Sequence, residues 1–346
     1  MDKNFFSKTA LLSFILSIVI LGGHLAIDVF YKFDNPSSFD KFWIIQIDFL
    51  RNSLFFIGVP FFFLKAGLLI FRNLSASEFP NKIKRRVFSL FVPYCSWNFI
   101  CWLFMAILFS LPFLSKYCLS RTFSFDFQTF LSSIFLFEYN MVNWFVLVLM
   151  IFSLVSIIFL PIVKNKYVGL GLILILFLQI NPIYDFFSAI CPPYGERVIR
   201  MLPFYLLGGV IAIHYPKYLS KVYSKTTVFI SWIAFILTAI LYYYVKVKYS
   251  IIITPLVLAE IIFIWIGLSR IEIKHKWWFD SSFIIYESQT IVASTILKLI
   301  LITFPKNCFF MVFNFYATCI LSALFCIGFY FILQKHPLLY KTLNGR

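Results

Sequence analysis

The sequence predicts an all-α integral membrane protein: a bundle of about ten transmembrane helices, forming one domain over residues 1–346, with both termini cytoplasmic. Three observations predict it. Hydrophobic residues make up 62% of the chain and charged residues only 13%, against about half and about a quarter in a soluble domain. Mean hydropathy is +0.91. Long apolar stretches recur from end to end, and Lys and Arg gather in alternate connecting segments.

Apolar stretches of about 20 residues are needed to cross the hydrocarbon of a bilayer. Ten candidate spans meet or approach this length: 10–30, 52–71, 87–110, 141–163, 167–181, 198–214, 226–245, 249–268, 280–304 and 310–333. The fifth is short and ends at Asn181 and Pro182. The segment 126–137 is short and amphipathic, which favours either a place in the interface or an extension of the fourth span.

Lys and Arg are shared unequally between the two sides that alternating spans define. With the N-terminus inside, the inside segments carry 18 of them and the outside loops carry 10. The positive-inside rule therefore favours both termini in the cytoplasm. The net charge of +16 then belongs to loops that face anionic lipid, so we expect the bilayer as a partner and no nucleic acid.

Missing motifs exclude several classes of function. The seven Cys are scattered, with no CxxC motif and no His/Cys cluster typical of a zinc site, so we expect no bound metal. A disulfide between Cys118 and Cys191, both in predicted outside loops, stays open. The chain has no Walker A loop and no dinucleotide-binding fingerprint, so ATP-driven transport is not expected.

Ionisable side chains inside predicted spans are candidates for function, because each is costly in lipid. His24 and Asp28 lie four residues apart in the first span, on one face of a helix. A carboxylate in that position orients an imidazole and raises its basicity, which predicts a general base facing a cavity. A polar pair that only holds helices together is the alternative. Lys65, in the second span, either binds an anionic group or pairs with an acid on another helix.

A basic run precedes the third span, where Lys82, Lys84, Arg85 and Arg86 fall within five residues. The positive-inside rule alone accounts for such a run. The other interpretation is a cytoplasmic site for the phosphates of a nucleotide-bearing donor, which the planar guanidinium of Arg binds well.

Six short motifs together resemble the bacterial transmembrane acyltransferase-3 family. They are, in order, His24 after Ile-Leu-Gly-Gly, Val59-Pro60-Phe61-Phe62 followed by Gly67, the basic run leading to Pro93-Tyr94-Cys95-Ser96-Trp97, Trp144-Phe145, Pro203-Phe204 with Gly208, and Ser282-Phe283 with Tyr286. Their order and spacing cover nearly the whole chain, and ten spans match the family.

The resemblance implies an enzyme that transfers an acyl group, often acetyl, from a cytoplasmic donor such as acetyl-CoA. Acetyl-CoA is then a co-substrate, and no bound cofactor is implied. The implied acceptor is a hydroxyl of a lipid-linked or exported glycan such as O-antigen, capsule or exopolysaccharide, and the implied location is the bacterial inner membrane. A homo-oligomer stays open.

The resemblance matches the family's His to His24 and its basic donor-site residues to the basic run, and together with the residues already singled out it leads to the following expected roles. His24 deprotonates the acceptor hydroxyl, or accepts the acyl group and passes it on, while Asp28 holds its imidazole in the useful tautomer. The basic run binds the donor. Lys65, Trp144 and Tyr286 are the predicted substrate-binding residues, with packing as the alternative for Trp144. His24 is the fifteenth residue of its predicted span, about 20 Å deep, so a cavity must reach that depth.

Four positions depart from the family pattern. Ser13 stands where a basic residue often lies eleven residues before the His, and the RxxR pattern of the family is not clean in the basic run. Gln289 replaces the His that often follows the Tyr of the ninth span, and Lys65 stands where many relatives are apolar. These departures bear on the donor site more than on the fold.

A glycan polymerase or a lipid-linked sugar transporter without acyl chemistry is the alternative function, because such proteins are also basic, aromatic-rich and polytopic. They usually carry a large extracytoplasmic loop, whereas the predicted outside loops here are short. A solute channel or transporter built on the charged interior groups is a third interpretation.

Overall fold

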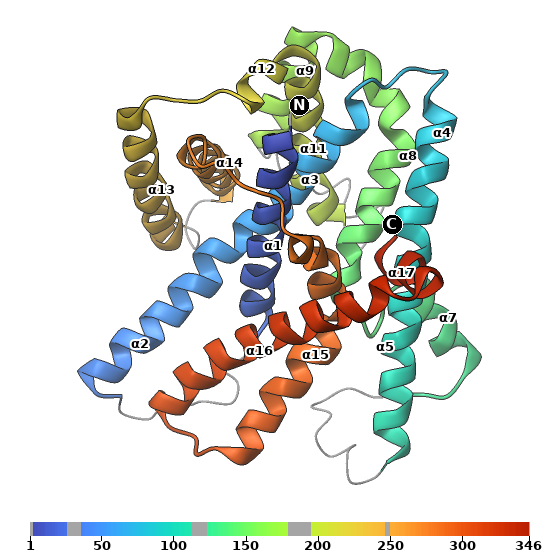
Figure 1. Cartoon of the computed structure of the whole chain (residues 1–346), viewed down its shortest axis with the longest axis vertical. Coiled ribbons are helices and arrows are strands. Elements are labelled where there is room, and N and C mark those ends of the chain that lie inside the picture. Colours follow the sequence, from blue (N-terminus) through green and yellow to red (C-terminus); the bar gives the residue numbers. More distant parts are fainter. Residues whose placement is uncertain (1–2, 26–35, 112–122, 179–194, 246–249, 346) are drawn as a thin grey trace.

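The protein is described by a computed structural model over residues 3–25, 36–111, 123–178, 195–245 and 250–345, and the regular elements within these ranges are all helices. Figure 1 shows long helices packed around α1 (Lys3–His24), which runs through the middle of the bundle. The predicted all-α class is confirmed. Asp28, Cys118 and Cys191 lie outside the described residues.

The helices follow one another along the whole chain. They are α2 (Ser38–Phe49), the π-helical turn η2 (Leu50–Leu54), α3 (Phe55–Phe71), α4 (Phe79–Arg86), the π-helical turn η3 (Val87–Phe91), α5 (Val92–Ser110), α7 (Phe127–Phe135), η4 (Met141–Asn143), α8 (Trp144–Lys164), α9 (Lys166–Phe177), α11 (Gly195–His214), α12 (Pro216–Leu219), α13 (Lys225–Val245), α14 (Ser250–Gly267), η5 (Trp277–Ser281), α15 (Ser282–Thr303), α16 (Cys308–Gln334) and α17 (Pro337–Asn344).

Within the described ranges, eight helical stretches are long and apolar enough to cross a membrane. They are Asn4–His24, Ser38–Phe71, Phe79–Ser110, Met141–Lys164, Arg197–His214, Lys225–Val245, Trp277–Thr303 and Cys308–Gln334. Two shorter apolar helices, Lys166–Phe177 and Thr254–Gly267, stand where the fifth and eighth spans are predicted. The chain is therefore a multi-pass integral membrane protein, and each predicted span corresponds to an apolar helix.

The helix boundaries differ from the sequence prediction at two places that matter for the site. The first helix begins seven residues earlier than expected and ends at His24. Two serines of this helix form hydrogen bonds to its own backbone. Ser13 Oγ donates to the Thr9 carbonyl at 2.7 Å, and Ser17 Oγ donates to the Ser13 carbonyl at 2.8 Å. The amphipathic segment forms a separate short helix, α7, which Asp126 caps by accepting from the Thr129 backbone N–H.

The segments predicted to be cytoplasmic gather in space. Residues near the start of α1 line cavities together with the segment after α11 and with the loop before η5. The basic run on α4 lines another cavity with α17, at the C-terminal end of the chain. The N-terminus, α12 and α4 all lie in the upper half of Figure 1. This arrangement agrees with both termini on one face of the bilayer, the one that the Lys and Arg bias assigns to the cytoplasm.

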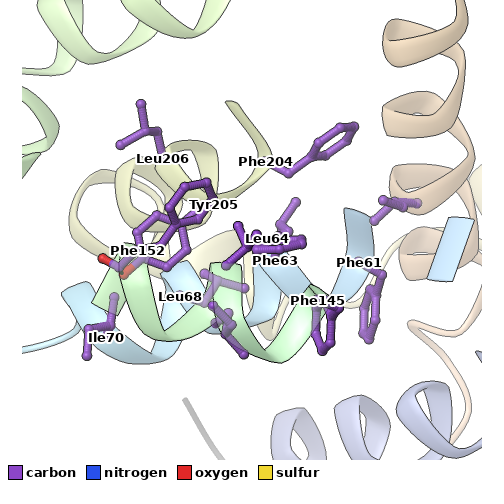
Figure 2. Close-up of a cluster of buried hydrophobic side chains, with 14 of the residues drawn as sticks. Phe61, Phe63, Leu64, Leu68, Ile70, Phe145, Phe152, Phe204, Tyr205 and Leu206 are labelled. Carbon is purple, nitrogen blue, oxygen red and sulfur yellow. Dashed lines mark hydrogen bonds between the residues drawn. The ribbon is translucent and has the colours of Figure 1, made fainter. Parts of the chain in front are cut away.

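The core of the bundle is the crossing of α3 and α11, where two glycines meet. A Cβ atom added at Gly67 would lie 1.9 Å from the carbonyl oxygen of Tyr205, and one at Gly208 would lie 2.1 Å from that of Leu64. The two backbones therefore touch directly, which small residues allow in membrane helices. Figure 2 shows the apolar side chains around this crossing, including Phe63 and Phe152. The contact fixes the slope of α3, which carries Lys65.

Replacing Gly208 by Leu should destabilise the bundle, because the new side chain must push the α3 backbone away. Overpacking of this kind costs about 3 kcal/mol or more when backbone has to move. Gly328→Leu is the matched control, since a Cβ at Gly328 meets nothing within 4 Å. Thermal unfolding in detergent should show a lower midpoint for Gly208→Leu alone; equal midpoints for the two variants would contradict the crossing.

Candidate active site

Two cavities meet near the cytoplasmic end of the bundle. The first, here called the basic cavity, has a volume of about 820 Å³ and is lined by Lys82, Lys84, Arg85, Arg86 and Lys341, among others. The second, the inner cavity, has a volume of about 250 Å³. Four residues line both of them, namely Leu69, Arg86, Ser89 and Gly345. The two cavities are therefore neighbours, with the half-buried Arg86 at their shared wall.

The residues of the basic run have two roles, one structural and one electrostatic. Lys82 Nζ donates to the carbonyls of Ile70, at 3.0 Å, and Arg72 at the end of α3. A cation at this position satisfies carbonyls left open by the helix terminus. Lys84 and Arg85 are exposed, and together with Arg86 they present positive charge to the basic cavity.

The C-terminal helix α17 forms the opposite wall of the basic cavity. Trp97 Nε1 on α5 donates to the Leu343 carbonyl at 2.9 Å, which ties α17 to the start of the third membrane helix. Gly345, at φ +68°, lies against the Ser89 carbonyl, where an added Cβ would come within 2.2 Å. Lys341 thereby joins the cavity, with its Nζ 5.7 Å from the centre of the Phe88 ring. Sequence reasoning missed Lys341, because only the fold brings it to the basic run.

A half-buried cation lines the inner cavity. Lys65 on α3 lines it together with Ser13 and Ser17 of α1 and Tyr286 of α15. Lys65 Nζ donates to Ser13 Oγ at 2.7 Å. An ammonium group therefore lies beside position 13, although the side chain at that position is Ser.

His24, the last residue of α1, is held by two neighbours. Its Nδ1 lies 3.1 Å from Gln289 Oε1 on α15. Its ring meets the edge of Phe55, with centres 4.9 Å apart. Gly23 permits this approach, since a Cβ there would lie 2.0 Å from the Phe55 ring. The imidazole is exposed, so it is fixed in orientation yet accessible.

Gln289 determines which nitrogen of His24 is basic. Its own Nε2 donates to the Tyr286 carbonyl at 2.8 Å, which leaves its oxygen facing the imidazole. An amide oxygen only accepts, so Nδ1 of His24 must carry the proton in this contact. The lone pair is then on Nε2, the nitrogen available to a substrate. Sequence reasoning assigned this orienting role to Asp28, which lies outside the described residues, and did not give one to Gln289.

The depth of His24 follows from its contact with α15. Gln289 lies 14 residues before the end of that helix at Thr303, so α15 continues for about 20 Å beyond the contact. Figure 1 shows α15 and α16 running on past the lower end of α1. On α1 itself, Ser17 of the inner cavity lies seven residues before His24, a rise of about 10 Å. The imidazole therefore lies about 10 Å further along the bundle than Ser17 of the inner cavity.

Tyr286 and Trp144, the other two predicted substrate-binding residues, have different surroundings. Tyr286 OH donates to the Val142 carbonyl at 2.8 Å, and the residue lines the inner cavity. The Arg197 guanidinium lies 5.4 Å from the centre of the Trp144 ring, a cation–π contact. The charge of Arg197 reaches both His24 and Tyr286. Arg197 was counted only as a loop charge in the sequence, so its contact with Trp144 was not predicted.

A buried polar network fixes α15 behind the imidazole. Glu287 is fully buried, and its carboxylate oxygens lie 2.9 and 3.1 Å from the side-chain amide nitrogen of Asn143 when that amide is turned toward them. With the amide so turned, the Asn143 oxygen is the atom that faces the Asn98 side chain on α5, at 2.6 Å. Thr290 donates to Asn140 at 3.1 Å. Satisfied polar groups of this kind rigidify a core, so the neighbouring Gln289 is held in place.

Lys65, Tyr286 and Arg86 line the inner cavity, and Arg86 also lines the basic cavity with Arg85. His24 is joined to this region by Gln289, which contacts the imidazole and the Tyr286 carbonyl. The fold is that of a polytopic membrane protein with a cavity lined by cations. The acyltransferase domain of the acyltransferase-3 family matches residues 11–332. The chain belongs to this family and is a membrane acyltransferase. No curated protein and no solved structure matches the chain.

Replacing Gln289 by Leu should lower the acyl-transfer rate constant by about ten- to a hundredfold, because the imidazole loses the bond that fixes its tautomer. The KM for the acyl donor should stay unchanged, since Gln289 does not line the basic cavity. Gln46→Leu is the matched control, as Gln46 bonds Tyr316 at 3.0 Å across two other helices. A raised donor KM in Gln289→Leu, or an equal loss of rate in both variants, would contradict the positioning role.

Proposed function

We propose that this acyltransferase moves an acetyl group from cytoplasmic acetyl-CoA to a hydroxyl of a cell-surface or lipid-linked glycan, at the inner membrane of a bacterium. The proposal is supported by the meeting of the basic and inner cavities at Arg86, and by the contacts that join His24 through Gln289 to Tyr286 of the inner cavity. All the residues involved belong to one chain, taken as one domain over residues 1–346, so the site needs no second copy.

The donor enters as a co-substrate and is not a resident cofactor. Lys84, Arg85, Arg86 and Lys341 bind its phosphates, because charge-assisted hydrogen bonds to phosphate are strong and Arg makes them in pairs. The pantetheine arm then passes Arg86 into the inner cavity, where Lys65 and Tyr286 line its path. Lys82, whose ammonium already bonds two carbonyls of α3, adds its charge to the electrostatic field of the cavity.

The reaction is an attack of an acceptor hydroxyl on the thioester. His24 Nε2 takes the hydroxyl proton, the oxygen forms a bond to the acyl carbon, and the carbon–sulfur bond breaks to release CoA thiolate, which regains the proton from the imidazolium. The alternative retained here is that Nε2 itself accepts the acyl group before the hydroxyl does. Arg197, whose charge reaches His24, stabilises the negative charge that develops on the carbonyl oxygen.

The position of the imidazole supports an acceptor on the far face of the membrane. His24 lies about 10 Å further along the bundle than Ser17 of the inner cavity, so in this proposal a donor held on one face meets an acceptor approaching from the other. A hydroxyl of an exported glycan, such as O-antigen, capsule or exopolysaccharide, fits an acceptor on that second face. Asp28 keeps its predicted role of orienting His24 as part of this proposal.

His24→Ala should abolish ester-linked acylation of surface glycan while the protein still inserts into the membrane at its normal level. Mass spectrometry of surface polysaccharide, with immunoblotting of membranes, measures both. His24→Gln serves as a second variant that keeps a polar side chain beside Gln289. Retained acylation would remove the catalytic assignment. A change in glycan chain length without any loss of acyl groups would favour the polymerase instead.

The double variant Arg85→Gln, Arg86→Gln should raise the KM for the acyl donor by about tenfold or more, because phosphate binding loses two charge-assisted bonds. Lys335→Gln is the matched control, since Lys335 lies at the end of α16 over the Phe331 ring. Donor-dependent release of free CoA thiol by isolated membranes measures the effect. An unchanged KM would mean that the positive-inside rule alone accounts for these residues.

A further inference from the structure

A third cavity, here called the apolar cavity, lies on the other side of Lys65 from the inner cavity. Its volume is about 330 Å³, within the range of small-molecule sites. Its walls come from α1, α3, α11, α12 and α14, and from the segment after α12, and most of them are apolar, including Leu64, Leu68, Ile211 and Ile261. The acyltransferase reaction makes no use of this space.

Lysines stand on the aromatic walls of the apolar cavity. Lys166 Nζ lies 5.2 Å from the centre of the Tyr215 ring, and Lys221 Nζ lies 5.5 Å from that of Tyr218. The two tyrosine rings are neighbours, with centres 6.0 Å apart, and both line the cavity. The two ammonium groups are therefore brought to the same part of its wall.

A third ammonium stands on another wall. Lys8 Nζ lies 4.9 Å from the centre of the Trp265 ring, which also lines the cavity. Lys221 lies in addition 5.0 Å from the ring of Tyr223, whose backbone carbonyl accepts from Arg270 Nε at 2.7 Å. No Asp or Glu is among the described residues that line the cavity, so its charge is uniformly positive.

The apolar cavity lies toward the end of the bundle that the Lys and Arg bias assigns to the cytoplasm. Thr9 from the start of α1 lines it, together with Leu219 of α12 and Tyr223 from the loop that follows. The positive-inside rule assigns these segments to the cytoplasmic side. An apolar chamber with cations at that end of the bundle matches an amphiphile with a hydrocarbon chain and a negative head, because anionic lipids concentrate positive side chains at the cytoplasmic leaflet.

We propose that the apolar cavity binds one anionic glycerophospholipid of the cytoplasmic leaflet. An acyl chain lies between α3, α11 and α14, where burial among apolar side chains stabilises it. The phosphate is bound by the ammonium groups of Lys166 and Lys221, with Lys8 adding charge from beside Trp265. Free phosphate alone does not fit, since it would leave the apolar walls unfilled. The site stands independently of the acceptor and donor proposed above.

The test is native mass spectrometry of the full-length protein, purified from nanodiscs that contain equal amounts of phosphatidylglycerol and phosphatidylcholine. The wild type should retain one phosphatidylglycerol and no phosphatidylcholine. Lys166→Gln with Lys221→Gln should weaken retention by about thirtyfold, the effect of two basic residues near an anionic lipid surface. Lys335→Gln, which removes an ammonium 4.7 Å from the Phe331 ring on another helix, should retain the lipid as the wild type does.

Ile261→Trp provides a second variant that fills the cavity without changing charge, and it should also lose the lipid. Size-exclusion chromatography confirms that each variant is folded. Equal retention of the two lipids, or full retention by the double Lys variant, would overturn the proposal. Displacement of the lipid by excess inorganic phosphate would show a site for phosphate alone, and capture of a polyprenyl phosphate from cell membranes in place of phosphatidylglycerol would overturn the choice of occupant.

Discussion

The hydrogen bond between His24 and Gln289 is the interaction on which the site depends. It joins the end of α1 to the interior of α15 at 3.1 Å, in a setting where each polar group must find its partner within the protein because lipid offers none. The Gln289 amide reaches back to the Tyr286 carbonyl, and Tyr286 lines the inner cavity. A single chain of contacts therefore connects the donor path with the orientation of the imidazole.

The same constraint accounts for the cations that the bundle carries inside. The ammonium of Lys65 is tolerated because Ser13 accepts from it, and Ser13 in turn donates to the backbone of α1. Lys82 satisfies the open carbonyls at the end of α3. Cations thus extend from Lys82 in the basic run to Lys65 in the middle of the bundle, and both are hydrogen-bonded within the protein. The anionic donor proposed above would meet this charge on its way to His24.

The fold was largely predictable from the sequence, because hydrophobic stretches of sufficient length must become helices in lipid. The ten predicted spans each correspond to an apolar helix, and the amphipathic segment 126–137 is a helix of its own. The boundaries of α1 were harder to predict. Its polar first turns pack inside the protein, with Lys8 and Thr9 buried, so the helix begins before its apolar run does.

The candidate site was predictable only where a residue is costly in lipid by itself. His24 and Lys65 can be recognised in the sequence for this reason. Gln289 and Lys341 do not, because an amide in a helix and a Lys near a terminus are unremarkable until the fold sets them beside His24 and Arg86. The contact of Lys65 with Ser13 has the same origin: two departures from the family pattern lie 52 residues apart in sequence and within 2.7 Å in space.

The most direct test of this account is a structure of the protein with a non-hydrolysable acyl-CoA thioether bound in a nanodisc. The account predicts that the diphosphate contacts Arg85 and Arg86, that the pantetheine arm passes Lys65, and that the acyl carbon points toward Nε2 of His24. An acyl group that ends in a cavity away from the imidazole, with the His24 ring turned toward lipid, would contradict it.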